Sequence, residues 1–409
     1  MNRKVVITEY RSHILAALIE DGKTVELHFS CPIPDKNAEY TCSGQPQSVQ
    51  RCRVGEIYVG KVRNILPNIH GAFIEIGDDI QCYYSLEEKT PPIFTHKLGK
   101  KPLCVGDELL VQVQKEAVKT KQPVVTGNLN FTGKYVVLTS GNLKTGVSNK
   151  LSKEKREALL ALGERYRESP FGLIFRTNSG AAPQEAIISE IEKLAEKLNQ
   201  VKKYGSMRTC YSRIYKVPSA WTSVLRDVYH EGLTEIIVDA TLKDGAVYQE
   251  AEEFLRNEQP EDLPLLRNYT DTSYSLVKCY GLEASIQEAL KEKVWMKSGA
   301  YLVIQPTEAL TVIDVNSGKC MKKQNDFTDI NQEAAREAAH QIRLRNLSGI
   351  IIIDFINMKT EEEKKRLLGY LQNELNQDPN PGKVMGMTHL QLVEITRKKI
   401  HKTLEESLQ

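Results

Sequence analysis

Four consecutive isoleucines between a glycine and an aspartate restrict the fold more than any other stretch of this sequence. The segment GIIIIDFIN (349–357) places Asp354 directly after Ile350–Ile353. A run of β-branched residues bounded by glycine predicts a strand that is buried on both faces. The aspartate either caps the next turn or lies where open α/β sheets bind ligands, beyond the carboxyl ends of their strands. On this segment alone, the structural interpretation is favoured.

The composition allows a large multidomain protein and names no partner. At roughly 100 to 200 residues per domain, a chain of 409 residues predicts two to four domains. The 55 Lys and Arg nearly balance the 53 Asp and Glu, which leaves a formal net charge of +2. Any contact with nucleic acid would therefore come from local basic patches rather than from the overall charge.

The sequence predicts neither a zinc site nor a disulfide framework. The eight cysteines include no C-x-x-C pair, and the eight histidines include no H-E-x-x-H motif. Charged residues interrupt the apolar N-terminal segment, so it predicts neither a signal peptide nor a membrane span. We therefore expect a reduced, cytoplasmic protein.

The first third of the chain predicts strands and a small barrel. An Asp-Gly pair (21–22) between HILAALIE and TVELHF is the expected turn of a hairpin. Residues 30–52 are rich in Pro, Ser, Gln and Gly and predict a long connection. Short alternating segments over about 54–126 are typical of a small closed β-barrel.

The remainder predicts mixed helices and strands. Residues 127–215 combine strands such as KYVVLTS and FGLIFRT with a stretch of helical periodicity, which indicates an α+β unit. The strand LTEIIVDA (233–240) and the helix and strand after it could join the N-terminal hairpin in one discontinuous sheet. The barrel and the α+β unit would then be insertions. Residues 283–409 alternate strands and helices, which favours an α/β layer fold.

A second apolar strand, within ALTVIDVNSG (309–318), also ends in an aspartate. Asp314 closes this strand, and the two-residue period of a strand places Asn316 on the same face. If the strands that carry Asp314 and Asp354 are neighbours, about 5 Å apart, the two carboxylates can hold one hard cation. Mg²⁺ or Mn²⁺ is the natural ion for such ligands. This arrangement suits metal-assisted phosphodiester hydrolysis, in which Asn316 could orient the water or the scissile phosphate.

The structural alternative is that Asp314 and Asp354 are two unrelated caps at strand ends. On spacing alone this alternative is slightly favoured, so the metal site needs support from elsewhere in the sequence.

The predicted barrel carries two aromatic residues on its polar side. Alternation within GAFIEIG and QCYYS leaves Phe73 and Tyr83 among polar neighbours. Single-stranded nucleic acid stacks its bases on such rings while its phosphates contact cations. A ring that fills a barrel end or covers a domain junction is the alternative, which is common for one aromatic residue and less so for two. The cations nearby in sequence are Lys61, Arg63, Lys115, Lys119 and Lys121.

The strand GLIFRT (172–177) ends in two hydrogen-bond donors. The guanidinium of Arg176 beside the hydroxyl of Thr177 is suited to a terminal phosphate. An arginine at the end of a strand is usually only solvated, so this motif alone is weak.

Taken together, these segments resemble the ribonuclease E/G family of bacterial endoribonucleases, in order and along nearly the whole chain. The matching motifs are GEIYVGKVRNILPNIHGAFIEIG in the barrel, then GLIFRT, SGAYLVIQPTEALTVIDVNSG, AAHQIRLRNLSGIIIIDFINM and LQLVEITRKK. The long central motifs are specific, and they favour the metal site over unrelated caps.

The resemblance implies a multidomain fold of α+β and α/β parts. A ribonuclease H-like sheet domain would contain an inserted OB barrel of the S1 type and a 5′-sensor module, and a deoxyribonuclease I-like catalytic domain would follow. The expected boundaries are 1–52 and 228–282 for the ribonuclease H-like parts, 53–126 for the barrel, 127–227 for the sensor and 283–409 for the catalytic domain.

The resemblance also implies the reaction. Asp314 and Asp354 match the family's Mg²⁺ ligands, and Asn316 matches its catalytic Asn. The substrate would be single-stranded, often A/U-rich RNA, including rRNA precursors and mRNA, hydrolysed to 3′-hydroxyl and 5′-phosphate ends.

Further residues match the family's RNA contacts. Phe73 and Tyr83 match its base-stacking aromatics, although the second is usually Phe, and Lys121 matches a basic contact of the barrel. The family also favours RNA with a 5′-monophosphate. The residues that match the pocket for this group are Gly133, Val137, Arg176 and Thr177.

The sequence departs from the family pattern in three places. Family members usually carry a Cys-Pro-x-Cys zinc link and a small dimerisation domain after the catalytic part, whereas this sequence stops at Gln409. We therefore expect a short member without zinc, whose homodimer, if it forms, is not tethered by a metal. The segment SGKCMKKQND (317–326) and residues 30–52 also differ from common family versions, so the positioning of substrate could have changed.

A rival hypothesis is an RNA-binding or regulatory protein of the same fold with little or no cleavage. The intact Asp314, Asn316 and Asp354 favour the enzyme, because a binding module does not need two carboxylates that repel the phosphate backbone. The missing tether favours the rival, because a family that shares sites across a dimer can lose its activity with the dimer. A third hypothesis, an α/β protein with structural aspartates, requires that the motif matches are accidental.

Overall fold

The computed structural model describes residues 2–30, 52–117, 122–219, 221–228, 230, 232–318, 326–358, 360–400 and 402–408. The chain divides into two compact units. Unit 1 consists of Met1–Ile33, Ala220–Leu255 and Glu261–Gln409, and unit 2 consists of Pro34–Ser219 and Arg256–Pro260. The long connection predicted at residues 30–52 lies almost entirely outside the described residues.

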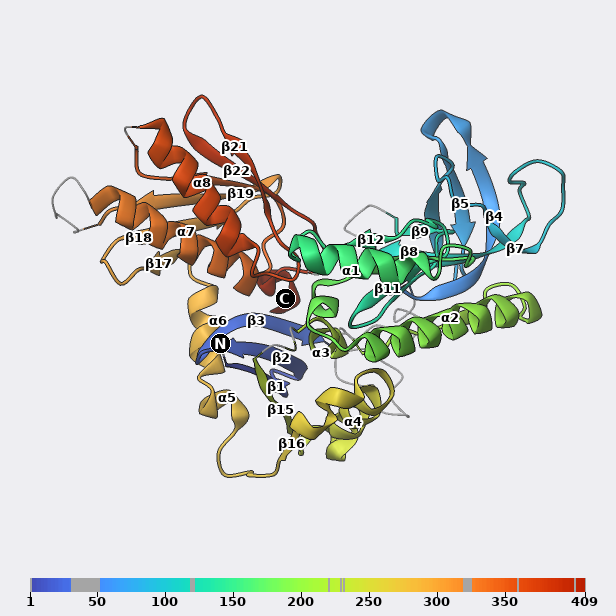
Figure 1. Ribbon diagram of the computed structural model, residues 1–409, viewed down its shortest axis with the longest axis horizontal. Helices are drawn as coiled ribbons and strands as arrows, with labels where there is room; N and C mark the ends of the chain where they lie inside the picture. Colours follow the sequence, from blue (N-terminus) through green and yellow to red (C-terminus); the bar gives the residue numbers. More distant parts are fainter. Residues whose placement is uncertain are drawn as a thin grey trace. The chain divides into compact units, whose positions relative to one another are not determined.

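The first sheet of unit 1 combines the N-terminal hairpin with strands from far along the chain (Figure 1). Its five strands follow the order β16-β15-β1-β2-β3, with β1 parallel to β15 and antiparallel to β2. Asp21 and Gly22 form the turn between β2 and β3, and both have the positive φ that a two-residue turn requires, 46° and 80°. The strands are β1 (Arg3–Tyr10), β2 (His13–Glu20), β3 (Lys23–Ser30), β15 (Leu233–Asp239) and β16 (Leu266–Tyr269).

Both faces of this five-stranded sheet are covered. Trp221 and the apolar residues of α3 and α4 pack on one face, and those of α5 and α6 pack on the other. This burial explains why β2 is apolar at six consecutive positions, Ile14–Ile19, which alternate between the two cores. The helices are α3 (Thr222–Asp227), α4 (Ala246–Glu258), α5 (Leu276–Cys279) and α6 (Leu282–Ala289), with 3-10 turns η4 (Leu242–Gly245) and η5 (Pro260–Leu265).

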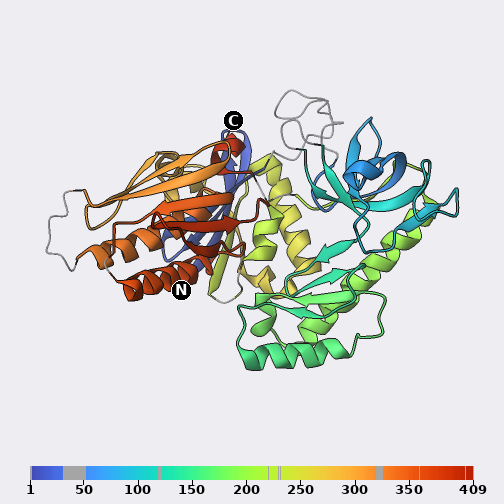
Figure 2. The ribbon, with the colours of Figure 1, turned by 90° about the horizontal axis from the view of Figure 1, so that it is seen from above.

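The second sheet of unit 1 has six strands in the order β17-β18-β19-β20-β22-β21. β19 and β20 are parallel neighbours connected through α7. A capping box of Thr360 and Glu363 starts α8. Figure 2 shows both α7 and α8 on the same side of this sheet. The elements are β17 (Lys293–Trp295), β18 (Tyr301–Pro306), β19 (Leu310–Asn316), α7 (Asp326–Leu344), β20 (Gly349–Asp354), α8 (Glu361–Leu375), β21 (Lys383–Met387), β22 (Leu392–Arg397) and α9 (Leu404–Leu408).

The isoleucine strand is buried on one face only, so the prediction of a strand buried on both faces is wrong. Ile351 and Ile353 are completely buried in the core with α7 and α8. Ile350 points the other way and is 53% exposed. A single layer of helices covers this sheet, and the isoleucines on its open face suit a strand because β-branched side chains pack well on a pleated surface. The second face is therefore an open surface, which we call the open face.

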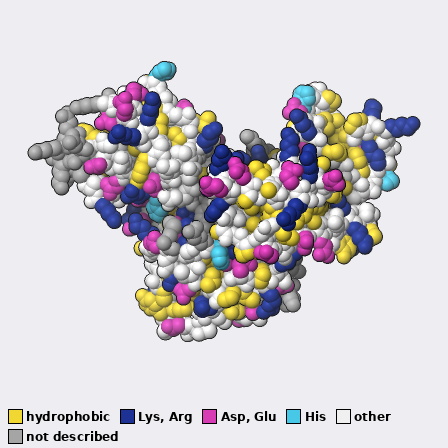
Figure 3. All heavy atoms as spheres, in the orientation of Figure 1, with side chains coloured by type: hydrophobic (Ala, Val, Ile, Leu, Met, Phe, Trp, Pro, Cys, Tyr) yellow, Lys and Arg dark blue, Asp and Glu magenta, His cyan; other side chains and the backbone are white. Residues whose placement is uncertain are grey.

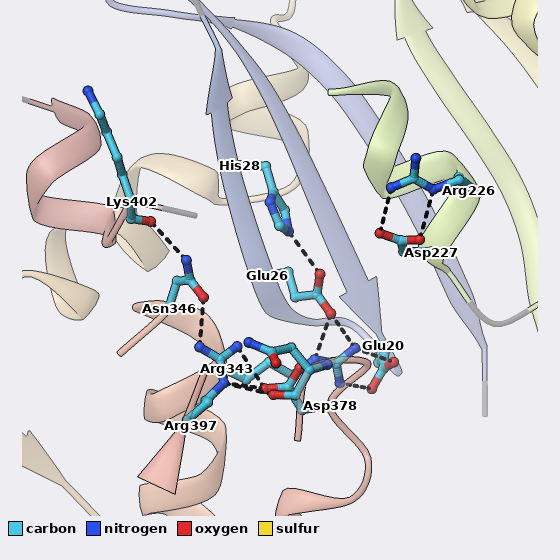
Figure 4. A network of polar contacts seen from close by, with 11 residues as sticks. Glu20, Glu26, His28, Arg226, Asp227, Arg343, Asn346, Asp378, Arg397 and Lys402 are labelled. Carbon is cyan, nitrogen blue, oxygen red and sulfur yellow. Dashed lines mark hydrogen bonds and ion pairs between the residues drawn. The ribbon is translucent and has the colours of Figure 1, made fainter. Parts of the chain in front are cut away.

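A network of charged side chains joins the two sheets of unit 1 (Figure 4). Arg343 at the end of α7 forms ion pairs with Glu20 at 3.2 Å and with Glu26 at 2.7 Å. Close by, Arg397 forms an ion pair with Asp378 at 2.9 Å and donates to the side-chain oxygen of Asn346 at 2.7 Å. Because Glu20 and Glu26 belong to β2 and β3, the Arg343 pairs connect the five-stranded sheet to the helical layer of the other sheet.

Unit 2 contains a closed barrel of five strands, as the alternating segments predicted. The ring runs β4-β5-β6-β9-β8 and is closed by antiparallel pairing of β4 with β8. Alternate residues such as Ile74 and Val111 point into its interior and are completely buried. The elements are β4 (Ile57–Leu66), η2 (Pro67–Ile69), β5 (Gly71–Glu75), β6 (Gln81–Ser85), β7 (Ile93–His96), β8 (Glu108–Lys115), β9 (Val124–Thr126) and β14 (Arg213–Tyr215), where β7 and β14 extend the sheet.

The rest of unit 2 is a four-stranded sheet with two helices. The strand order is β10-β11-β13-β12, and α2 packs against it through residues at helical spacing, including Ile187, Ile191 and Leu194. The elements are β10 (Asn130–Thr132), β11 (Val136–Thr139), β12 (Gly146–Val147), α1 (Lys153–Glu164), β13 (Gly172–Phe175), η3 (Thr177–Gly180) and α2 (Gln184–Met207). In the described part of the chain, no helix is long and apolar enough to cross a membrane.

Candidate functional site

Two aspartates lie side by side at the ends of β19 and β20. The strands are parallel neighbours whose register pairs Asp314 directly with Asp354. Directly opposed residues project from the same face of a sheet, and here it is the open face, because Ile313 and Ile353 are buried on the other. Neighbouring strands lie about 5 Å apart, so the two carboxylates are within reach of one ion.

Asn316 belongs to the same group. Its side-chain nitrogen donates to a carboxylate oxygen of Asp314 at 2.7 Å. This bond fixes the amide beside the aspartate pair and uses one of its two N–H donors. The second N–H can donate to a ligand, and the amide oxygen can accept from a ligand or a water. The structure therefore brings together the three residues that the sequence proposed as a centre.

The carboxylate of Asp354 does not act as a cap. Throughout the described ranges, it accepts no hydrogen bond from a backbone N–H or a side chain. A strand-end cap requires such a bond. An exposed carboxylate with no partner among the described residues, directly opposite a second carboxylate, is better explained by a ligand that both would share.

The donor set fits a hard cation that keeps most of its water. Among the described residues, no group of three or more His, Cys, Asp and Glu is placed to hold a metal ion. Mg²⁺ does not need such a cage, because it is usually bound by one or two carboxylates together with waters and substrate phosphates. Two carboxylates directly opposed on neighbouring strands match this pattern.

The two barrel aromatics face each other across β5 and β6. Phe73 and Tyr83 are directly opposed in the register, and their rings form an edge-to-face pair with centroids 6.4 Å apart. Both are half-buried, whereas the neighbouring Ile74 is completely buried inside the barrel. The ring of Tyr83 covers Gly71, where an added Cβ would overlap it. The rings thus form one partly exposed aromatic surface on the outside of the barrel.

The cations that lie close to these aromatic residues in sequence are in part already paired. Lys61 pairs with Glu108 at 3.5 Å, and Arg63 pairs with Glu75. Lys115 is exposed, and Lys119 and Lys121 lie outside the described residues. Figure 3 shows Lys and Arg interspersed with Asp and Glu on the face that it draws. Recognition of a phosphate backbone would therefore depend on a few local cations, as the net charge of +2 predicts.

The four residues of the predicted phosphate pocket come together in the four-stranded sheet. Gly133 lies in the turn between β10 and β11, and Val137 on β11 pairs with Ile174 on β13. The guanidinium of Arg176 donates to the carbonyl oxygen of Gly133 at 2.7 Å. The hydroxyl groups of Thr177 and Ser148 lie 3.0 Å apart. Arg176 is thus bonded to the turn that contains Gly133, and the predicted phosphate site consists of this arginine and this turn.

Glu190 is a residue of this pocket that the sequence interpretation missed. Its carboxylate accepts hydrogen bonds from the consecutive backbone N–H groups of residues 134–136, at 2.7, 2.8 and 2.8 Å. An added Cβ on Gly133 would overlap the same carboxylate, so only glycine fits there. The signal in the sequence was a glutamate on the apolar face of α2, three residues after Ile187 and four before Leu194.

Glu190 is a buried anion in a nest of backbone donors. Burial raises its pKa, and the three N–H groups and the nearby Arg176 partly oppose this rise. The three N–H bonds fix the conformation of the turn that contains Gly133. Glu190 therefore holds in place the part of the backbone to which Arg176 is bonded.

The Ribonuclease E/G family profile matches residues 130–400 of this sequence. The chain belongs to the ribonuclease E/G family. It is 34% identical over 361 residues to Ribonuclease E of Synechocystis sp., a match that covers 87% of this chain and 53% of that protein. It is 33% identical over 406 residues to Ribonuclease G of Haemophilus influenzae, covering 96% of this chain and 78% of that protein.

Other relatives give the same result. Ribonuclease G of Escherichia coli (strain K12) is 31% identical over 425 residues, covering 100% of this chain and 82% of that protein. The chain spans about half the length of the Ribonuclease E proteins from Synechocystis and Nostoc, at 53% and 56%. The match to the ribonuclease E/G family profile includes the aspartate pair and the pocket around Arg176, whereas Phe73 and Tyr83 precede it.

Proposed function

We propose that this chain is a Mg²⁺-dependent endoribonuclease that hydrolyses single-stranded RNA in RNA processing and decay. The pairing of Asp314 with Asp354 on the open face, with Asn316 bonded to the first, is the observation that carries the proposal. Membership of the ribonuclease E/G family supports it. The proposed substrates are rRNA precursors and mRNA, and we propose a cytoplasmic location, where such RNA is present.

The three residues of the centre would have two different roles, metal binding and hydrogen bonding. Asp314 and Asp354 would hold the cation, which, when bound, polarises a phosphoryl oxygen and makes a bound water more acidic. Asn316, held by its bond to Asp314, would accept a hydrogen bond from the attacking water or donate one to the scissile phosphate. Since both carboxylates lie on an open surface, an extended strand can reach them without unfolding of the sheet.

A cleavage assay tests this function. Purified protein is incubated with a short A/U-rich RNA that carries a 5′-monophosphate, with Mg²⁺ and separately with a chelator. We expect internal cleavage that requires Mg²⁺ and leaves 3′-hydroxyl and 5′-phosphate ends. RNA that binds but stays intact, also with Mn²⁺, would support the rival hypothesis of an RNA-binding protein without cleavage.

We further propose that Phe73 and Tyr83 bind the bases of the RNA. Replacing Phe73 by Ala should weaken binding of single-stranded RNA by about 1–3 kcal/mol, which is the usual contribution of one base stacked on an aromatic ring. Binding is measured in chelator by fluorescence anisotropy, so that cleavage does not interfere.

Tyr83→Phe is the matched control for this prediction. It keeps the ring over Gly71 and removes only the hydroxyl group, which donates to the carbonyl oxygen of Ile69 at 3.2 Å. Its affinity should stay close to that of the wild type. An unchanged affinity in Phe73→Ala would show that the ring pair is structural.

We propose that the pocket of Gly133, Val137, Arg176 and Thr177 reads the 5′-monophosphate. Replacing Arg176 by Ala should reduce the preference for a 5′-monophosphate over a 5′-hydroxyl substrate about tenfold or more, because a hydrogen bond to a charged group contributes about 1.5–3 kcal/mol. The rate on the 5′-hydroxyl substrate should change little. The ratio of the two rates is the measurement.

Arg167→Ala is the control for the sensor, since this arginine of the same sheet unit is 81% exposed. Arg176→Lys gives a second test, because it keeps the charge but loses the planar fork of donors. We expect a partial loss of preference in that variant. If both Arg176 variants keep the wild-type preference for 5′-monophosphate RNA, the pocket does not recognise the 5′ end.

The finer structural assignments are part of the same proposal. We propose that the five-stranded sheet is the ribonuclease H-like domain, that the barrel is of the S1 type and that the six-stranded sheet is the deoxyribonuclease I-like domain. The parallel pairing of β1 with β15 supports an insertion of the barrel and sensor into the first of these. A preference for A/U-rich RNA and an untethered homodimer stay predictions.

A further inference from the structure

The open face carries an aromatic pair in the same rows as the proposed nuclease centre. Trp295 on β17 is directly opposite Tyr301 on β18, and Tyr301 is directly opposite Asn316 on β19. The adjacent row runs from Lys293 through Val303 to Asp314 and Asp354. Since opposed residues share a face, the two aromatic rings and the lysine project from the same surface as the aspartate pair.

The spacing of the strands places these rings close to the centre. Trp295 and Asn316 are two strand spacings apart, or about 10 Å between their backbones. The other side of β18 is buried, with Leu302 and Ile304 completely covered in the core. A strand of RNA that lies across the open face at Asp314 would therefore reach Trp295 without leaving the sheet.

Trp295 is exposed far more than its size would predict. The chain has two tryptophans, and Trp221 is completely buried, whereas Trp295 is 63% exposed. Its ring centroid lies 4.9 Å from that of Tyr301, so the two rings support each other at the surface. Large aromatic side chains normally bury most of their area. A supported ring that stays largely exposed is a platform on which a planar group can stack.

Lys293 provides the charge beside this platform. Its ammonium group lies 4.2 Å from the ring centroid of Trp295 and 3.5 Å from that of Tyr301. These cation–π contacts hold the ammonium group next to the rings. Aromatic rings beside a cation are the combination that binds single-stranded nucleic acid, because every base has a face to stack and every nucleotide carries a phosphate.

We propose that Trp295 and Tyr301, together with Lys293, form a base-stacking subsite for the RNA strand next to the cleavage centre. The proposal rests on the proposed function, since the strand that it binds is the one to be cleaved. The subsite would hold one base beside the scissile phosphate and would keep the backbone aligned with Asp314 and Asp354. It is separate from the aromatic pair of the barrel, which belongs to the other unit.

The structural alternative is that these residues only protect the edge of the sheet. β17 is an edge strand, and a lysine or a bulky ring on such a strand discourages pairing with other chains. That role depends on the edge being blocked and not on the identity of a nucleotide. The two explanations therefore differ in whether binding depends on a base at one position of the RNA.

A double-mutant cycle with abasic RNA separates them. Trp295→Ala, Trp295→Phe and the wild type are titrated in chelator with a short single-stranded RNA and with versions that lack one base at successive positions. We expect Trp295→Ala to bind the intact RNA about 5- to 150-fold more weakly, and Trp295→Phe to lose less. At one position only, loss of the base should weaken the wild type but not Trp295→Ala.

Tyr274→Ala is the matched control, because Tyr274 is an exposed aromatic residue of the same unit in a segment outside the six-stranded sheet. It should bind every RNA like the wild type. In Lys293→Gln, the negative slope of log affinity against log salt should become less steep by about 0.7, the value for one phosphate contact with a single strand.

The outcomes keep this proposal distinct from the proposed function. If the wild type cleaves RNA and Trp295→Ala binds and cleaves like it at every abasic position, the subsite is wrong and the nuclease assignment stands. If the wild type binds without cleavage but the coupling at one position is present, the subsite stands and the nuclease assignment is wrong. Equal weakening at all positions would indicate a structural role and would overturn the subsite.

Discussion

Asp354→Asn should abolish the cleavage of RNA while leaving the fold and the affinity for RNA in chelator intact. The substitution keeps the shape of the side chain but removes the charge of a carboxylate that the protein leaves exposed opposite Asp314. A bound cation contributes several kcal/mol to catalysis, and each ~1.4 kcal/mol is a factor of ten in rate. We therefore expect a loss of about 10³-fold or more.

Asp314→Asn should have an effect of the same size, since the two carboxylates would share one ion. An amide oxygen at this position can still accept the hydrogen bond from Asn316, so the local structure should be retained. Circular dichroism and thermal unfolding of both variants check this. Rates are measured under single-turnover conditions with increasing Mg²⁺, and excess Mg²⁺ should not restore the wild-type rate.

Glu394→Gln is the control for charge on the same surface. Glu394 is an exposed carboxylate on β22, opposite Ile352 in the register and outside the row of the aspartate pair. Its removal should change the rate only a few fold, because an exposed charge without a role in binding is strongly screened by water. A cleavage rate that falls equally in Glu394→Gln and in the aspartate variants would contradict the assignment of the centre.

The second large effect is on stability. Arg343→Met should destabilise unit 1 by about 3–5 kcal/mol, because it leaves two buried carboxylates without the guanidinium that lies between them. Glu20 and Glu26 are both largely buried, and in the variant Glu20 would keep its ion pair with Arg3 and Glu26 its pair with His28. Because these pairs would still compensate part of the buried charge, we expect a destabilisation near the lower end of that range. Denaturant unfolding followed by circular dichroism is the measurement.

The pH dependence of this effect has a definite sign. Burial raises the pKa of Glu26, but Arg343 and His28 outweigh it, so that the pKa in the folded protein lies well below the ordinary value of 4.5. A carboxyl group with a depressed pKa stabilises the fold above its unfolded pKa, and this contribution is lost as the pH falls further. The difference between wild type and Arg343→Met should therefore shrink below about pH 4.5.

Two further variants separate the charge network from general effects of substitution. Lys399→Met removes a surface ion pair in which Lys399 and Glu406 are both 44% exposed, and it should cost no more than about 1 kcal/mol. Adding Glu26→Gln to Arg343→Met should recover part of the lost stability, because one unpaired buried charge is then gone. A cost for Arg343→Met as small as that for Lys399→Met would show that the network contributes little.

The sequence determined the local elements and the residues of the proposed centre. The period of two in the barrel segments predicted that Phe73 would lie outside the core formed by Ile74. Apolar runs ending in Asp314 and Asp354 predicted two strands that each present a carboxylate. These predictions depend on alternation and helical periodicity, which a single chain carries in its order of residues.

The tertiary structure decided which of these elements are neighbours and which faces stay open. Only the pairing of β19 with β20 places Asp314 beside Asp354, and only the single layer formed by α7 and α8 leaves the isoleucine strand exposed on one side. The same pairing brings Trp295, from an edge strand, into line with Asn316. Strand order and helical cover are set by contacts between residues far apart in sequence, and no local pattern records them.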